Sequence, residues 1–214
     1  MKVTTDACLF GAWVAEEMQN AKGKMKNILD IGSGTGLLSL MVAQKNNSRI
    51  DAVEIDRYAA EEANENIQNA PWKEQITIHH LNILEFHPDH LYDAIICNPP
   101  FYENEWTSDN SRKNTSHHSQ HLNLKEVLDV IKKHLSEQGI YYLLLPAKRE
   151  TKLKFMLEEM GLHIHKLVTV SLSPSNKRIM ISGSKQSIRQ IETGQITVND
   201  ERFKTLLKDY YLYA

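Results

Sequence analysis

The chain has 214 residues, a net charge of −2 and no hydrophobic run near the ~18 residues that cross a membrane, so we expect one domain with a sizeable core and no membrane association. This charge excludes a protein that binds polyanions over its whole surface, so contact with nucleic acid would need a local basic patch. The only cysteines, Cys8 and Cys97, lie in apolar surroundings, which excludes a disulfide framework and a cysteine zinc site and, without a signal-peptide pattern, indicates a cytoplasmic protein.

Strands and helices are expected to alternate through the first two thirds of the chain. We expect helices at 8–20, 35–44, 58–70 and 122–137, and strands at 27–31, 49–55, 75–81, 92–97 and 140–145. This alternation is typical of parallel β-α-β units. The stretch 103–121 is long and polar, which predicts a mobile substrate lid rather than a packed element.

The last third of the chain has a different pattern. A helix at 151–160 precedes strands at 163–172 and 178–183, whose short connection predicts an antiparallel hairpin at the sheet edge, and 200–211 is expected to form a final helix. A reversed hairpin is typical of Rossmann-like class I S-adenosylmethionine-dependent methyltransferases. We therefore expect an α/β fold with a seven-stranded, mostly parallel sheet, one antiparallel edge strand and helices on both faces.

We expect residues 1–214 to form one methyltransferase domain. Its predicted parts are an N-terminal helix and cofactor cover at 1–26, a cofactor-binding core at 27–145, and a C-terminal part at 146–214 that holds a helix, the hairpin and the final helix.

A glycine-rich turn, Asp30-Ile31-Gly32-Ser33-Gly34-Thr35-Gly36, joins the first expected strand to a helix. Its glycines permit positive φ and a close approach of the backbone to a ligand, a feature that dinucleotide sites share. The carboxylate of Asp30 would repel a pyrophosphate, whereas it suits the ammonium and sulfonium of S-adenosylmethionine. A dinucleotide site is the less favoured alternative.

Glu54 follows Gly36 by 18 residues, near the spacing of about 20 expected for an acid that binds ribose hydroxyls. Asp56 is expected to be a helix N-cap. Asn82 and Ile83 are candidates for the edge and the face of the adenine ring, although Asn82 also suits a plain turn. The residues expected to contact the cofactor are Thr5, Asp6, Asp30, Gly32, Ser33, Gly34, Gly36, Leu37, Glu54, Ile55, Asn82, Ile83 and Asn98.

Asn98-Pro99-Pro100-Phe101 follows the strand expected at 92–97. Two prolines end the strand, because neither has an N–H and both hold φ near −65°. An amide, a fixed carbonyl and an aromatic ring at that edge suit a flat group that carries an NH2. The alternative is a turn with a capping asparagine and a core phenylalanine.

Together, the glycine turn and the Asn-Pro-Pro-Phe motif resemble methyltransferases that act on planar, conjugated nitrogens. Residues 1–13 (MKVTTDACLFGAW), 51–56 (DAVEID) and 206–212 (LLKDYYL) are similar to bacterial tRNA(Val) adenine-37 N6-methyltransferases, over nearly the whole chain. Two features depart from that family: the sequence starts without its short leading segment, and His117 and His118 stand in place of an Arg-His pair.

The resemblance implies an S-adenosylmethionine-dependent enzyme that methylates N6 of adenosine 37 in tRNA(Val). Guanine N2 of rRNA or a protein glutamine amide is the alternative acceptor, and a cofactor-binding module without activity is a third hypothesis. We expect tRNA as the partner, no DNA, no required protein partner and no metal. The expected catalytic residues are Asn98, Pro99, Pro100 and Phe101: the Asn98 side-chain oxygen and the Pro99 carbonyl accept the two N6–H bonds, and Phe101 stacks on the base.

The candidate substrate contacts are weaker predictions. Tyr102 and Trp106 would stack on neighbouring bases or simply anchor their loop. Arg112 and His118 would contact phosphates, with a solvated surface as the alternative. Lys177 and Arg178, in the hairpin, are the better candidates for an RNA-facing patch.

Overall fold

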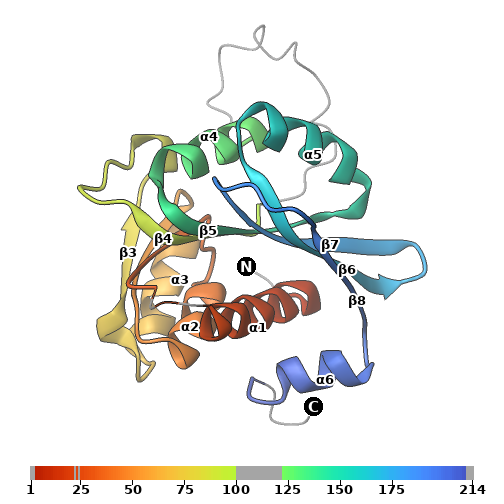
Figure 1. Ribbon diagram of the computed structural model, residues 1–214. Helices are drawn as coiled ribbons and strands as arrows, with labels where there is room; N and C mark the ends of the chain where they lie inside the picture. Colours follow the sequence, from red (N-terminus) through yellow and green to blue (C-terminus); the bar gives the residue numbers. More distant parts are fainter. Residues whose placement is uncertain (1–2, 22, 24, 100–121, 211–214) are drawn as a thin grey trace, which may run out of the picture.

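The structure, a computed structural model, describes residues 3–21, 23, 25–99 and 122–210, and it has one mixed sheet covered by helices on both faces (Figure 1). Its strands are β1 (Asn27–Ile31), β2 (Arg49–Glu54), β3 (Ile76–His80), β4 (Tyr92–Cys97), β5 (Leu135–Pro146), β6 (His163–Ser173), β7 (Asn176–Ser184) and β8 (Glu192–Thr197). The helices are α1 (Thr5–Asn20), α2 (Leu37–Lys45), α3 (Arg57–Gln68), α4 (Leu124–His134), α5 (Glu150–Glu159) and α6 (Glu201–Leu207). Short 3-10 turns are η1 (Lys73–Gln75), η2 (Ile83–Glu85) and η4 (Ala147–Arg149).

The strand order is β3-β2-β1-β4-β5-β7-β6-β8. Neighbours from β3 to β5 pair in parallel, β7 pairs antiparallel with both β5 and β6, and β8 pairs in parallel with β6. The predicted α/β class I methyltransferase fold and its reversed hairpin are therefore confirmed. In the described part of the chain the sheet has eight strands rather than the expected seven, because β8 pairs with β6 beyond the hairpin. The reversed strand β7 lies between β5 and β6.

The strand β8 was missed because its sequence, Glu-Thr-Gly-Gln-Ile-Thr, lacks the apolar alternation of a half-buried strand. All its side chains except that of Ile196 are exposed, so backbone pairing with β6 forms it. The helix expected at 122–137 also ends early, at His134, because Leu135 already pairs with Tyr92 of β4.

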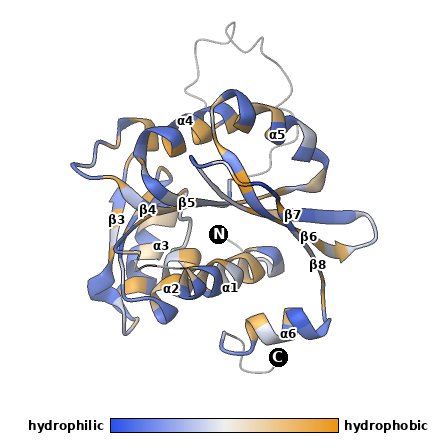
Figure 2. Ribbon diagram, viewed as in Figure 1, coloured by the Kyte–Doolittle hydropathy of each residue, from blue (hydrophilic) through white to orange (hydrophobic). Residues whose placement is uncertain are grey.

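Successive apolar side chains of the central strands point to opposite faces of the sheet, and they form two cores, one on each face. In β5, for example, Tyr142 and Leu144 join one core while Tyr141 and Leu143 join the other. The first core is covered by α1, α2, α3 and α6, and the second by α4 and α5. In Figure 2 hydrophobic and hydrophilic colours alternate along α4, because only one side of that helix packs on the sheet.

Helix α1 is buried along most of its length, which is unusual for a helix near a chain end. The ring of Trp13 meets that of Tyr142 edge-on, with centroids 5.8 Å apart. Gly11 lets α1 approach α2 closely, since a Cβ there would lie 2.6 Å from the sulfur of Met41. The helix therefore lies wedged between the sheet, α2 and α6.

Candidate active site

The glycine turn lies where the strand order reverses, between β1 and β4, which is the usual ligand site of an open α/β sheet. Gly32, Gly34 and Gly36 have φ of 69°, 56° and 81°, which favours glycine at each position. The amides of Gly32 and Ser33 both donate to the carbonyl of Val53, at 2.9 and 3.1 Å. The turn is thereby tied to the carboxyl end of β2.

Glu54, at the end of β2, holds the same turn through its side chain. One carboxylate oxygen accepts a hydrogen bond from the Gly34 amide at 2.8 Å, and the other accepts one from the Asp56 amide at 2.9 Å. The residue is only 6% exposed, and it lines the cavity described below. Each oxygen keeps a lone pair for a further donor, so the carboxylate is oriented in advance for a pair of hydroxyls.

Asp30 lies beneath the turn and is fully buried. Its Oδ2 accepts a hydrogen bond from the Ser39 hydroxyl at 2.7 Å, whereas Oδ1 and the Ser33 hydroxyl have no partner among the described residues. Burial raises the pKa of Asp30 to about 6, the hydrogen bond from Ser39 opposes this, and the charge of Glu54 adds to it. A buried carboxylate with an unsatisfied oxygen fits a nearby cationic ligand.

A cavity of about 860 Å³ opens at this edge of the sheet, within the size range of small-molecule and cofactor sites. It is lined by most of the residues predicted to contact the cofactor: Thr5, Asp6, Gly32, Ser33, Gly34, Leu37, Glu54, Ile55, Asn82, Ile83 and Asn98. Two predicted contacts, Asp30 and Gly36, do not line it. Gly36 instead sits at the N-cap of α2, where a Cβ would lie 3.5 Å from Ala63 of α3.

The carboxyl end of β4 brings the second motif to the same cavity. Ile31 and Cys97 are register partners in β1 and β4, so Asn98 and Pro99 emerge beside the glycine turn, and both line the cavity. The other predicted catalytic residues, Pro100 and Phe101, lie outside the described residues, as do the predicted substrate contacts Tyr102, Trp106, Arg112 and His118 and the lid expected at 103–121.

The side of the cavity beyond Glu54 is formed by Asn82, Ile83 and Ile55. Asn82 caps η2, because its side-chain oxygen accepts a hydrogen bond from the Leu84 amide at 3.0 Å. The turn role considered for Asn82 is therefore present, and its side chain also borders the cavity. Asp56 is the N-cap of α3, as predicted, and accepts a hydrogen bond from Ala59.

The cavity wall also contains an ion pair that the sequence did not suggest. Nε of Arg178, on β7, lies 3.0 Å from Oδ2 of Asp6, in the first turn of α1, and its Nη1 donates to Asn176. Arg178, predicted as an RNA contact, thus belongs to the cavity wall, whereas Lys177 is exposed and does not line the cavity.

Leu122, just before α4, and Glu126, in its first turn, also line the cavity and were not predicted. Glu126 forms a capping box with Asn123, in which each side chain accepts a hydrogen bond from the backbone amide of the other residue. The spacing Asn-x-x-Glu is a sequence signal of a helix start, and it would have moved the start of the helix expected at 122–137 to Leu124.

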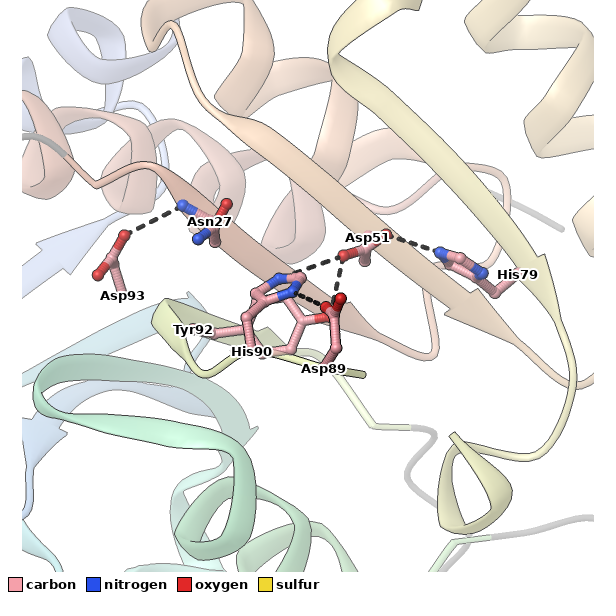
Figure 3. A network of polar contacts seen from close by, with 7 residues as sticks. All are labelled: Asn27, Asp51, His79, Asp89, His90, Tyr92 and Asp93. Carbon is pink, nitrogen blue, oxygen red and sulfur yellow. Dashed lines mark hydrogen bonds and ion pairs between the residues drawn. The ribbon is translucent and has the colours of Figure 1, made fainter. Parts of the chain in front are cut away.

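A separate polar network joins Asp51 on β2, His79 on β3 and Tyr92 on β4 (Figure 3). Asp51 lies 2.7 Å from Nε2 of His79 and accepts a hydrogen bond from the Tyr92 hydroxyl at 2.9 Å. None of these residues lines the cavity, so the network stabilises the sheet rather than the site.

Two negative findings concern the described part of the chain. It holds no group of three or more histidine, cysteine or acidic residues that could bind a metal ion. In the same described residues, no helix has the length and apolar character needed to cross a membrane.

Comparisons with known proteins agree with this geometry. A sequence model of the methyltransferase small domain matches residues 11–160. The tRNA1(Val) (adenine(37)-N6)-methyltransferase of Dyadobacter fermentans is 36% identical over 225 residues, which cover 99% of this chain and 91% of the relative. The protein of the same name from Aliivibrio salmonicida is 41% identical over 171 residues, which cover 79% of this chain and 70% of the relative.

Among solved structures, an S-adenosylmethionine-dependent methyltransferase from Clostridium acetobutylicum has a TM-score of 0.60 and 12% identity, and the match covers 82% of this chain and 90% of that chain. At such identity the likeness shows the fold alone. The sequence matches go further, because the match to the Dyadobacter protein covers 99% of this chain and 91% of that relative. The chain belongs to the tRNA1(Val) (adenine(37)-N6)-methyltransferase family, a group of class I enzymes that use S-adenosylmethionine.

Proposed function

We propose that this protein transfers the methyl group of S-adenosylmethionine to N6 of adenosine 37 in tRNA(Val). The observation that carries the proposal is that Asn98 and Pro99 line the same cavity as the glycine turn and Glu54. Acceptors suited to an exocyclic amine thus lie beside a site suited to the cofactor. The name shared by the relatives supports adenosine 37 over the guanine and glutamine acceptors.

We assign the cofactor contacts from the cavity lining. Glu54 accepts hydrogen bonds from both ribose hydroxyls, using the lone pairs that the Gly34 and Asp56 amides leave open. Ile83 packs on the adenine ring, and Asn82 meets its edge. Asp30 stabilises the positive charge of the ligand from below the turn. When bound, S-adenosylmethionine supplies an electrophilic methyl group together with its own leaving group.

The acceptor residues address the low reactivity of the adenine amine, whose lone pair is delocalised into the ring. The side-chain oxygen of Asn98 and the carbonyl of Pro99 each accept one N6–H bond. These two bonds hold the nitrogen towards pyramidal geometry, which localises the lone pair on N6. They also strengthen as positive charge develops on the nitrogen, so they stabilise the transition state more than the bound substrate.

The stacking roles of Phe101, Tyr102 and Trp106 and the phosphate contacts of Arg112 and His118 stay predictions, because these residues lie outside the described part of the chain. The base must leave its stack to reach the cavity, which costs a few kcal/mol and less in a loop than in a duplex. An aromatic ring beside Asn98 would offset part of that cost.

The test is a methylation assay with labelled S-adenosylmethionine and purified full-length protein. The substrates are transcribed tRNA(Val), the same tRNA with guanosine at position 37, rRNA fragments and a protein extract. We expect label only in the first, with N6-methyladenosine as the product by mass spectrometry. Label in rRNA or protein, or label in the position-37 variant, would overturn the proposed substrate, and no label anywhere would overturn the enzymatic role.

We further propose that residues 1–214 work as one domain in the cytoplasm and need no protein partner. The support is the single sheet, to which strands from Asn27 to Thr197 contribute. Helix α1, near the N-terminus, also packs against α6, near the C-terminus, as well as against α2. Activity of the purified chain alone, with one cooperative unfolding transition, is the expected result.

A further inference from the structure

A cluster of basic residues follows the carboxyl end of β5. The segment from Ala147 to Lys154 spans η4 and the first half of α5, and it contains Lys148, Arg149, Lys152 and Lys154 against one acid, Glu150. That acid pairs with Lys154 at 2.6 Å within α5. The segment is thus strongly positive in a protein whose net charge is −2.

The sheet register places this cluster next to the acceptor residues. Strand β5 lies beside β4, with Leu143 opposite Cys97, and continues in the same direction to Pro146. Because Asn98 and Pro99 follow Cys97, the end of β5 and η4 lie at the same edge of the sheet. Helix α5 then turns back over the face that α4 also covers (Figure 1).

The hairpin adds a further lysine to this edge. Pro146 of β5 is opposite Arg178 of β7, and η4 packs against β7. Lys177 precedes Arg178, so it lies level with the start of η4 on the neighbouring strand. We use the name basic rim for the set formed by Lys148, Arg149, Lys152 and Lys177.

We propose that the basic rim binds the phosphate backbone of the RNA substrate and aligns the target adenosine with Asn98. Three observations argue for this occupant: the local charge is opposite to the overall charge, the rim adjoins the cavity wall at Arg178, and Lys148, Lys152 and Lys177 are all exposed. The inference rests on the proposed function, because it takes the substrate of that same site to be an RNA.

The test compares two double variants of the full-length protein. Lys148→Gln with Lys152→Gln removes charge from the rim, while Lys73→Gln with Lys132→Gln removes the same charge elsewhere. The two control lysines are also exposed, and they lie near the opposite edge, at η1 before β3 and near the end of α4 before β5. Binding of transcribed tRNA(Val) is measured from 50 to 300 mM salt, and cofactor affinity is measured by calorimetry.

We expect the rim variant to bind tRNA about 10-fold more weakly at physiological salt, with the slope of log K against log salt reduced by about 1 to 2, because each phosphate contact releases counterions. Its affinity for S-adenosylmethionine should stay within twofold, which shows that the fold is intact. The control variant should keep both the affinity and the slope for tRNA.

Two outcomes would overturn the inference without touching the proposed function: equal losses in both variants, or a rim variant that binds tRNA as the wild type does while the wild type methylates adenosine 37. A wild-type protein that neither binds nor methylates tRNA would instead overturn the proposed function, and this inference with it.

Discussion

Replacing Glu54 by glutamine tests how the cavity holds a ribose. The substitution keeps the size and shape of the side chain but removes its charge and one of its two acceptor oxygens. In the wild type both oxygens already accept a backbone amide, from Gly34 at 2.8 Å and from Asp56 at 2.9 Å. The NH2 group of the glutamine must therefore face one of these N–H donors, or the side chain must rotate away from the glycine turn.

The magnitude follows from that geometry. A hydrogen bond to a charged group is worth about 1.5–3 kcal/mol, and Glu54→Gln loses at least one of the two proposed ribose bonds. Because about 1.4 kcal/mol corresponds to a factor of ten, the affinity for S-adenosylmethionine should fall about 10- to 150-fold. Where the new NH2 group faces the backbone N–H of Gly34 or Asp56, the repulsion between the two donors adds to this loss of affinity.

The assay is calorimetric titration of each variant with S-adenosylmethionine and with S-adenosylhomocysteine, since both carry the same ribose. Both affinities should fall by a similar factor. The matched control is Glu61→Gln, on α3. Glu61 pairs with Arg57 on the surface and does not line the cavity. An affinity within twofold of the wild type for Glu54→Gln would refute the ribose assignment.

Three further predictions concern the rest of the site. Asn98→Ala should lower kcat by about 10²- to 10³-fold while cofactor affinity persists, and near-normal turnover would contradict the role of Asn98. Breaking the wall with Arg178→Met, or with Asp6→Asn, should raise KM for S-adenosylmethionine about fivefold or more with little change in kcat, because the first turn of α1 loses its anchor; kinetics in which only kcat falls would argue against this positioning role. In the protein without cofactor, burial raises the pKa of Asp30 from 3.8 to about 6, so the stability that this shift provides is complete below pH 3.8 and is lost as the pH rises through 6. Asp30→Asn cannot titrate, so its free energy of unfolding by urea should decline less than that of the wild type between pH 4 and 7.5, by up to about 3 kcal/mol; identical pH profiles would show that Asp30 does not titrate as described.

The fold was largely predictable from sequence because strong local patterns mark its central elements. The strands β1 and β4 have the expected bounds, since apolar runs and turn residues delimit them. The strand β8 could not be predicted, because its pairing with β6 uses the backbone and its side chains carry little signal. The end of α4 was misplaced for a similar reason, because the pairing of Leu135 with Tyr92 is a tertiary contact.

The candidate site likewise has residues that could be predicted from sequence and residues that could not. The lining positions of Gly32, Glu54 and Asn98 followed from motifs at the ends of strands, where topology alone brings residues together. The partner of Arg178 could not be predicted, because Asp6 lies 172 residues away in sequence and meets it only in the folded protein. Likewise, no pattern marks Ser39 as the hydrogen-bond donor to Asp30.

The packing of α1 has a consequence for how a ligand binds in the cavity. Its first turn supplies Thr5 and Asp6 to the wall, while the body of the same helix is wedged between α2, α6 and the sheet. This portion of the wall is continuous with the buried body of α1, and the ion pair with Arg178 holds its first turn in place. It is therefore preorganised, and a ligand that docks against it is spared the entropic cost of ordering that segment.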